Sequence, residues 1–307
     1  MLHINTPLIH SPLFSSRLKK DIYLKMDCFQ PSGSFKIRGI GKRCLELKKE
    51  GCRHFIIASG GNAGLAVAYS GWKLGIQSTI VLPESSPSFI IEKLKVYQSS
   101  VIVKGKNWNE SNEFALSLTK DPGTSFVHPF DHPTIWNGNS SLVDEVNQQI
   151  NTPPDLVVVA VGGGGYFNGI MEGLLRNKWS HTKILTMETF GADSLYQSVQ
   201  ENKKIKLSSI DSIAHSLGAR SVSDKTFEYA LQSHVKSEII TDQSAIYSCN
   251  QFLNDQQVLV EPACGAALSV LYKEQKFIQN FQSILICVCG GSGINMEQLI
   301  QYKNQFD

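Results

Sequence analysis

The sequence lacks any apolar run that approaches the roughly 20 residues needed to cross a bilayer. Its opening stretch, "MLHINTPLIHSPLF", also lacks the charged start and apolar segment of a secretory signal. Neither sign of charge dominates, because 29 Lys and Arg face 27 Asp and Glu, for a net charge of +2. We therefore expect a cytoplasmic protein that binds neither membranes nor nucleic acid and whose partner is a small molecule.

The seven cysteines form an odd set without a CxxC pair, which argues against a disulfide framework and against a zinc site. We expect most of them to be buried thiols. His128 and His132 stand four apart, but Pro129 and Pro133 disfavour the helix that a metal-binding pair would need.

From about residue 54, short apolar runs alternate with helix-length amphipathic stretches. Examples of the runs are "HFIIAS", "STIVLP", "DLVVVAV" and "SILICVCG". This rhythm is typical of parallel sheets covered on both faces by helices, and it predicts two α/β lobes with sites at the carboxyl ends of the strands. The segment "HPFDHPTIWNGNSS" is the predicted crossing between the lobes.

The strongest ligand signal is "VGGGGYFNGI", in which Gly162, Gly163, Gly164 and Gly165 lie between a predicted strand and a predicted helix. Successive glycine amides and a helix N-terminus favour an anion, so this turn predicts a phosphate cradle. The dinucleotide and P-loop patterns are both absent, which excludes the usual NAD and ATP sites. The alternative is that these glycines only permit close packing of strand and helix.

Two further turns follow predicted strands. In "ASGGNAG", residues Ser59, Gly60, Gly61 and Asn62 can present a hydroxyl and amide groups to a carboxylate, or can simply cap a helix. In "CVCGGSG", the thiol of Cys289 can face a ring nitrogen, or can be a small buried apolar group.

Lys36 stands in "PSGSFKIRGIG", straight after a strand-like run and at the start of a predicted helix. The amine at this turn and the cradle for one phosphate together indicate a cofactor with one aldehyde and one phosphate. The nicotinamide and ATP signatures, which would indicate other cofactors, are missing. Pyridoxal 5'-phosphate fits that description.

The sequence resembles the serine/threonine dehydratases of the fold-type II pyridoxal-phosphate enzymes. The motifs are "PSGSFKIRGIG", "SGGNAGLAVAY", "VGGGG", "METFGA", "LVEPACGAAL" and "CGGSGIN", in order from about residue 22 to about 298. The resemblance implies a two-lobed α/β fold like the tryptophan synthase β chain, each lobe a largely parallel sheet flanked by helices. We expect a large cofactor-binding domain at residues 1–31 and 132–307, with a small domain at 32–131 inserted in it.

The resemblance also implies roles for single residues. Lys36 is the expected Schiff-base lysine, Phe35 packs on one face of the pyridine, and Asn62 bonds its phenolic oxygen. The phosphate is expected at Gly162 to Gly165, the ring nitrogen at Cys289, and the substrate carboxylate at the loop from Ser59 to Asn62. The implied monovalent cation, possible K⁺, has five expected ligands: Gly162, Glu188, Ala192, Leu217 and Ala219. Glu188 could instead cap a helix or pair with a lysine.

The implied activity is α,β-elimination of L-serine to pyruvate and ammonia, and of L-threonine to 2-oxobutanoate, in amino-acid catabolism that feeds gluconeogenesis. Lys36 is expected to act as both anchor and base, with its pKa lowered by burial. The motifs offer no histidine or carboxylate as acid, so the cofactor phosphate is expected to protonate the leaving hydroxyl. A homodimer is expected from the family.

Two residues depart from the family pattern. Gly60 stands where close members carry alanine, and Ser216 stands where a small apolar residue packs the second face of the cofactor. A dehydratase is expected, and a more flexible carboxylate loop could lower its turnover by misplacing the substrate. The alternatives are a serine racemase, a β-replacing enzyme similar to cysteine synthase, and a weak cofactor- or amino-acid-binding relic.

Overall fold

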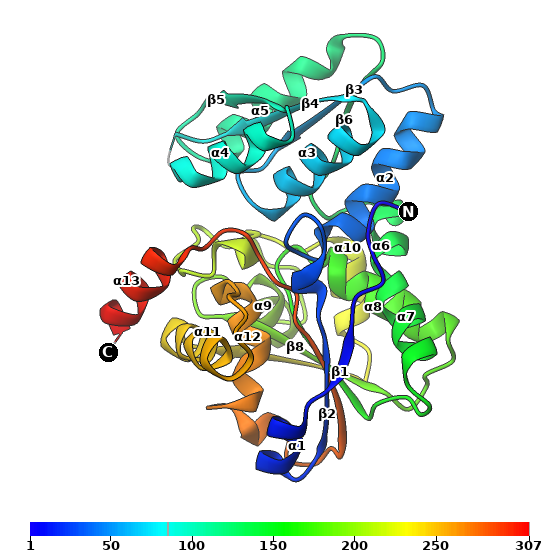
Figure 1. The fold of residues 1–307 in the computed structure, drawn as a ribbon, viewed down its shortest axis with the longest axis vertical. Coiled ribbons are helices and arrows are strands. Elements are labelled where there is room, and N and C mark those ends of the chain that lie inside the picture. Colours follow the sequence, from blue (N-terminus) through cyan, green and yellow to red (C-terminus); the bar gives the residue numbers. More distant parts are fainter. Residues whose placement is uncertain (85, 307) are drawn as a thin grey trace.

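The computed structural model describes residues 1–84 and 86–306, and within them the strands form one sheet of six and one of four. Figure 1 shows the smaller sheet and its helices as an upper lobe above the larger one. Every strand pairing is parallel except the one that joins the first two strands. The predicted α/β architecture of two lobes, each a largely parallel sheet flanked by helices, is confirmed.

The larger sheet has the strand order β1-β2-β10-β7-β8-β9. Its strands are β1 (Leu8–His10), β2 (Asp21–Lys25), β7 (Leu156–Ala160), β8 (Lys183–Thr189), β9 (Val235–Ile240) and β10 (Ser283–Cys287). The α-helices of this lobe are α1 (Pro12–Leu18), α6 (Pro133–Asn139), α7 (Ser141–Gln149), α8 (Gly165–Arg176), α9 (Ser194–Gln200), α10 (Asp224–Ala230), α11 (Asp242–Gln256), α12 (Pro262–Leu268) and α13 (Met296–Phe306). Because β2 pairs with β10, the early part of the chain lies beside its late part.

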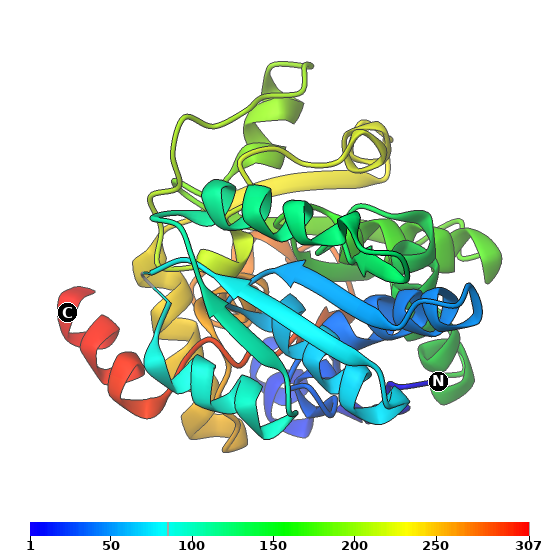
Figure 2. The same ribbon diagram turned by 90° about the horizontal axis from the view of Figure 1, so that it is seen from above.

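The smaller sheet has the order β5-β4-β3-β6. Its strands are β3 (His54–Ala58), β4 (Gln77–Leu82), β5 (Ser100–Val103) and β6 (Thr124–Phe126). Its helices are α2 (Lys36–Lys49), α3 (Asn62–Leu74), α4 (Ser88–Val96) and α5 (Trp108–Ser117), and Figure 2 shows this lobe from above. Short 3-10 turns complete the description: η1 (Asp27–Phe29), η2 (Leu118–Lys120), η3 (His215–Leu217), η4 (Ser269–Leu271) and η5 (Gln275–Phe277).

The strands form where short apolar runs can be buried on both faces. Every residue of β7 is buried, as are the last four residues of β3. A strand without a polar face needs helices on both sides of its sheet, which is the parallel α/β arrangement. Among the described residues, no helix is both long and apolar enough to span a bilayer.

Two details differ from the sequence prediction. The edge strand β1 was not expected, because its three residues carry no strand signal of their own. The predicted crossing at residues 128–141 contains helix α6, which begins at Pro133 with His132 as its N-cap. Proline suits a first helical position because its missing N–H would have no partner there. The domain boundaries at 31/32 and 131/132 stay a prediction.

Helices α2, α6 and α8 pack with their backbones in contact. A Cβ atom added at Gly39 of α2 would lie 2.5 Å from the carbonyl oxygen of Ile135 in α6. One added at Gly169 of α8 would lie 2.4 Å from the Cβ of Asn139 in α6. Since α2 begins at Lys36 and α8 begins at the glycine cradle, this close packing sets one site element relative to the other.

A group of buried charges joins the first turn of α2 to the end of β2. Arg38 donates hydrogen bonds of 2.8 and 2.7 Å to the carboxylate of Asp27, and of 2.6 and 2.7 Å to that of Glu145. Lys25 forms an ion pair of 2.7 Å with Glu145. The side chains of Arg38, Asp27 and Lys25 are wholly buried. Two positive charges therefore balance two negative ones, and the polar atoms are paired as burial requires.

We predict that Asp27→Ala lowers the free energy of unfolding by about 3–5 kcal/mol, because it leaves the buried Arg38 with only part of its countercharge. Urea unfolding of the two proteins measures the difference. The control is Glu92→Ala, which removes the exposed pair of Glu92 with Lys95 and should cost less than about 1 kcal/mol. Equal effects of the two substitutions would contradict a structural role for the buried charges.

Candidate active site

Lys36 is the first residue of α2, and its Nζ donates a hydrogen bond of 2.8 Å to the carbonyl oxygen of Pro129. Loss of solvent lowers the pKa of Lys36 to about 8, while the charge of Glu261 opposes that shift. A lysine with this pKa is partly a free amine near neutral pH, as a nucleophile or base must be.

The segment that leads into Lys36 is bonded to the segment that follows β10. The amide of Phe35 donates to the carbonyl oxygen of Cys289 at 3.1 Å, and the amide of Gly291 donates to that of Gly33 at 2.9 Å. Lys36 and Cys289, predicted from opposite ends of the sequence, are thus brought into one site.

Phe35 is supported from one side by an aromatic ring of the other lobe. Its ring stacks on that of Tyr166, with centroids 3.9 Å apart and planes at 22°. The Tyr166 hydroxyl in turn donates a hydrogen bond of 2.8 Å to Asp27 in the buried charge group. Phe35 is therefore held in place by the same residues that anchor the first turn of α2.

The four glycines, Gly162 to Gly165, connect β7 to α8 as predicted. Gly164 has φ +96°, and a Cβ atom there would lie 1.8 Å from Oγ1 of Thr226. A Cβ atom at Gly163 would lie 2.4 Å from the ring of Phe130. Side chains are excluded from this turn, and the N-terminus of a 12-residue helix leaves amide groups for an anion.

The loop from His128 to Phe130 links Lys36 to the cradle, since Pro129 accepts from Lys36 and Phe130 packs on Gly163. The Nδ1 of His128 accepts a hydrogen bond of 2.7 Å from the Asp131 amide. Burial lowers the pKa of His128 to about 4, with further lowering by the charges of Lys36 and His132. His128 is therefore a neutral imidazole close to Lys36, which the sequence did not predict.

The loop from Ser59 to Gly61 joins β3 to α3, and Asn62 opens that helix. The Asn62 side chain points across the lobes: its Oδ1 accepts from the amide of Ser292 at 2.8 Å. Its Nδ2 donates to Ser216 Oγ at 3.3 Å and to Glu261 Oε1 at 2.7 Å. Ser59, Asn62 and Ser216, three residues predicted for the site, thus lie on neighbouring segments.

Glu261 is the residue that the sequence analysis missed. The sequence prediction assigned Glu261 no role, but the residue is buried beside Asn62 and its charge acts on Lys36. The prediction that the cofactor phosphate, and no histidine or carboxylate, serves as the acid stays a prediction. The signal was present in "LVEPACGAAL", where one acidic residue interrupts an apolar stretch. It was overlooked because an acidic residue before proline also suits a helix start.

Cys289 is buried just after β10. A hydrogen bond with the Cys264 thiol, followed by burial, raises the pKa of Cys289 well above its ordinary value. The side chain is therefore a protonated, uncharged thiol. This suits the predicted contact with a ring nitrogen that is itself uncharged.

The structure shows a different contact for Glu188, one of the residues predicted to bind a cation. The Glu188 carboxylate accepts hydrogen bonds from the amides of Leu195 and Tyr196, at 3.0 and 2.6 Å, so it caps the start of α9. Burial raises the pKa of Glu188 to about 8. Capping was the alternative left open by the sequence. Gly162 packs against Leu217, while the cation role of these residues and of Ala192 and Ala219 stays a prediction.

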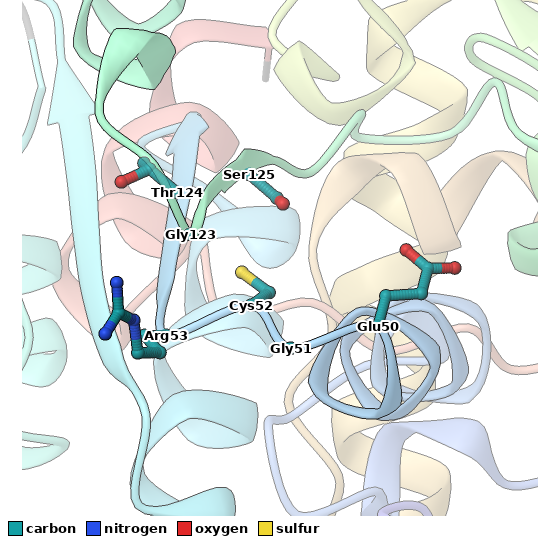
Figure 3. Close-up of a pocket in the computed structure, with 7 residues that line it drawn as sticks. All are labelled: Glu50, Gly51, Cys52, Arg53, Gly123, Thr124 and Ser125. Carbon is teal, nitrogen blue, oxygen red and sulfur yellow. The ribbon is translucent and has the colours of Figure 1, made fainter.

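A separate pocket of about 540 Å³ is drawn in Figure 3. Its lining residues are Glu50, Gly51, Cys52, Arg53, Gly123, Thr124 and Ser125. Because α2 has 14 residues and rises about 1.5 Å per residue, this pocket lies roughly 20 Å from Lys36 along the helix. It contains none of the residues of the candidate site.

The family comparison agrees with this geometry. A family model described as "Pyridoxal-phosphate dependent enzyme" matches residues 1–290. The chain belongs to this family.

Relatives of this pyridoxal-phosphate-dependent enzyme are similar over nearly their whole length. "Serine dehydratase-like" from Rattus norvegicus is 43% identical over 313 residues, covering 99% of this chain and 95% of that protein. "L-serine dehydratase" from Dictyostelium discoideum is 42% identical over 317 residues, covering 97% and 91%. The structure of a fungal L-serine ammonia-lyase from Rhizomucor miehei matches with a TM-score of 0.95 and 31% identity, covering 100% and 99%.

The residues present fit pyridoxal phosphate. Lys36 offers an amine of lowered pKa for the aldehyde, and the cradle excludes side chains where a phosphate would need backbone amides. Phe35 offers an aromatic face and Cys289 a neutral thiol. The roles of these single residues stay predictions.

We predict that in the cofactor-free enzyme Lys36 reacts with a small acylating reagent at a rate that rises with pH and levels off above about pH 8. Below that pH the ammonium form is unreactive, and above it the amine is fully formed. An ordinary lysine continues to gain reactivity to about pH 10.4. Mass spectrometry of the Lys36 peptide measures the rate, and a rise that persists to pH 10 would refute the lowered pKa.

We predict that Gly164→Ala weakens cofactor binding at least about tenfold and lowers the free energy of unfolding by about 1–3 kcal/mol. The methyl group would clash with Thr226, and alanine would be strained at φ +96°. Gly61→Ala is the stability control, because nothing lies within 4 Å of the added Cβ. Absorbance titration with the cofactor and urea unfolding give the two quantities; an unchanged Gly164→Ala protein would count against the cradle.

Proposed function

We propose that this enzyme is an L-serine ammonia-lyase, which converts L-serine to pyruvate and ammonia and also converts L-threonine to 2-oxobutanoate. The observation that carries this proposal is the placement of Lys36. Its amine, with a pKa of about 8, donates a hydrogen bond to the carbonyl oxygen of Pro129, and the next residue, Phe130, packs on the glycine turn. Relatives named serine dehydratase, similar over the whole chain, support the same reaction.

Lys36 acts as both anchor and base. At pH 7 a group with a pKa of about 8 is a free amine in roughly a tenth of molecules, against far fewer for an ordinary lysine. As a free amine, Lys36 would take the proton from the α-carbon of the bound substrate. The Pro129 carbonyl, which accepts from Nζ, holds the amine at the start of α2.

The loop from Ser59 to Gly61 receives the substrate carboxylate. It precedes the 13-residue helix α3, so its amides and the positive end of that helix favour a negative group. The Ser59 hydroxyl lies in the same turn and can donate a further hydrogen bond. Fixing the carboxylate presents the α-carbon to Lys36.

When bound, pyridoxal phosphate supplies the electron sink for the pair left on the α-carbon. Cys289 would tune this chemistry, because its protonated thiol beside the ring nitrogen would leave that nitrogen uncharged, whereas a carboxylate partner would keep it protonated. A neutral partner at this position would therefore favour loss of the β-hydroxyl over transamination.

The finer expectations belong to the same proposal and have the family resemblance as their support. We propose K⁺ near Gly162 and Glu188, a homodimeric assembly, a cytoplasmic location and a role in amino-acid catabolism that feeds gluconeogenesis. Isologous pairing is the commonest arrangement of soluble homo-oligomers.

We predict that the wild-type enzyme forms pyruvate from L-serine and that Lys36→Ala loses at least about 100-fold in rate, because it lacks both anchor and base. A coupled keto-acid assay measures both. Lys49→Ala, an exposed lysine on the same helix, is the matched control and should keep the wild-type rate.

Analysis of all products formed from L-serine, together with the cofactor absorbance, separates the alternatives. Formation of D-serine would indicate a racemase, and capture of an added thiol in place of keto-acid release would indicate a β-replacing enzyme. A change in the cofactor absorbance on adding serine without any product would indicate a binding protein with negligible turnover.

A further inference from the structure

Glu261 is the last residue before helix α12, where an acidic side chain ordinarily caps the helix. Here it makes no capping hydrogen bond to α12. Its side chain instead reaches toward Asn62 and toward the loop that follows Cys289, and the residue is only 5% exposed. The carboxylate of Glu261 is therefore held by contacts with Asn62 and Gly293 and not by the N-terminus of α12.

Glu261 determines the orientation of the Asn62 amide. Its Oε1 accepts from Asn62 Nδ2 at 2.7 Å, while Asn62 Oδ1 accepts from the Ser292 amide at 2.8 Å. A rotated amide would place the NH₂ group against an N–H donor and the carbonyl oxygen against a carboxylate. The NH₂ group of Asn62 is therefore fixed on the side of Glu261 and Ser216.

The loop after Cys289 is shaped around the same carboxylate. The Gly293 amide donates to Glu261 Oε2 at 3.3 Å. Gly291 has φ +124°, and a Cβ atom there would lie 2.0 Å from Cδ of Glu261. Only a residue without a side chain allows the backbone to pass this close.

The charge of Glu261 also acts on the reactive amine. Among charged groups it has the largest effect on Lys36, and it raises the pKa of that lysine against the effect of burial. Its field reaches Lys93, Cys249 and Cys289 as well. Burial raises the pKa of Glu261 itself, and bonds from Ser216, Gly293 and Asn62 oppose this shift.

We propose that Glu261 is a positioning residue of the elimination site, which turns the NH₂ group of Asn62 toward the cofactor and places a negative charge whose field reaches Lys36. The inference rests on the proposed function, because it assigns Asn62 and Lys36 their roles with pyridoxal phosphate. Glu261 acts through these two residues, by a hydrogen bond in one case and through its charge in the other.

Two substitutions separate these effects. Glu261→Gln keeps the shape and removes the charge, and its own amide can no longer accept from both Asn62 and Gly293. Glu261→Asp keeps the charge and shortens the reach to Asn62. Both should weaken cofactor binding about tenfold, because a hydrogen bond to a charged acceptor is lost or weakened. Absorbance titration of cofactor-free protein gives the dissociation constants.

The pH dependence of kcat separates the two variants. Loss of the negative charge disfavours the ammonium form of Lys36. The acid limb, which is the part of the pH profile where kcat rises with pH, should therefore move about one pH unit lower in Glu261→Gln. Glu261→Asp should keep the wild-type limb. The control is Glu274→Gln. Glu274 is a part-buried carboxylate outside the site that accepts a hydrogen bond from Ser244, so its substitution should change neither the cofactor dissociation constant nor the acid limb.

Thermal unfolding of each cofactor-free variant shows whether it folds. Folded Glu261→Gln and Glu261→Asp proteins with the wild-type dissociation constant and acid limb would overturn the inference. If Glu261→Gln does not fold, wild-type cofactor affinity in Glu261→Asp would overturn it. Failure of the wild-type enzyme to bind the cofactor or release pyruvate would instead refute the proposed function, so the two failures are distinct.

Discussion

The buried pairing of Arg38 with Asp27 is the constraint on which the site depends. Arg38 lies in the first turn of α2, two residues beyond Lys36, and Asp27 follows β2 of the larger lobe. Such a pair is costly to bury unless both charges are fully bonded, so it permits one arrangement of the two segments and disfavours others. Tyr166 extends this constraint to Phe35 through one hydrogen bond and one ring stack.

A second constraint is the close packing of helices. Gly39 lets α2 contact α6, and Gly169 lets α8 contact α6. The start of α2, which carries Lys36, and the glycine turn before α8 are thereby fixed relative to each other through a third helix. Protein interiors pack densely, so a displacement of α6 would be transmitted to both.

Much of this could be predicted from sequence, because the fold repeats a local pattern. Runs such as "LVVVA" are apolar on both faces, and glycine turns follow them where parallel sheets place ligands. The rest depends on contacts between distant residues. The strand β1 is short and pairs only with β2, the side-chain direction of Glu261 follows from Asn62 and Gly293, and Glu188 turned out to cap α9. None of these three features produces a periodic pattern of apolar residues in the sequence.

The pairing of β2 with β10 has a consequence for when the site can form during synthesis. Lys36 leaves the ribosome well before Cys289, whose backbone carbonyl binds Phe35 and whose thiol lies in the same site. Chains fold from the N-terminal side as synthesis proceeds, and contacts between distant segments form late. A nascent or prematurely terminated chain that stops before β10 thus carries Lys36 without the backbone and thiol that surround it in the folded protein.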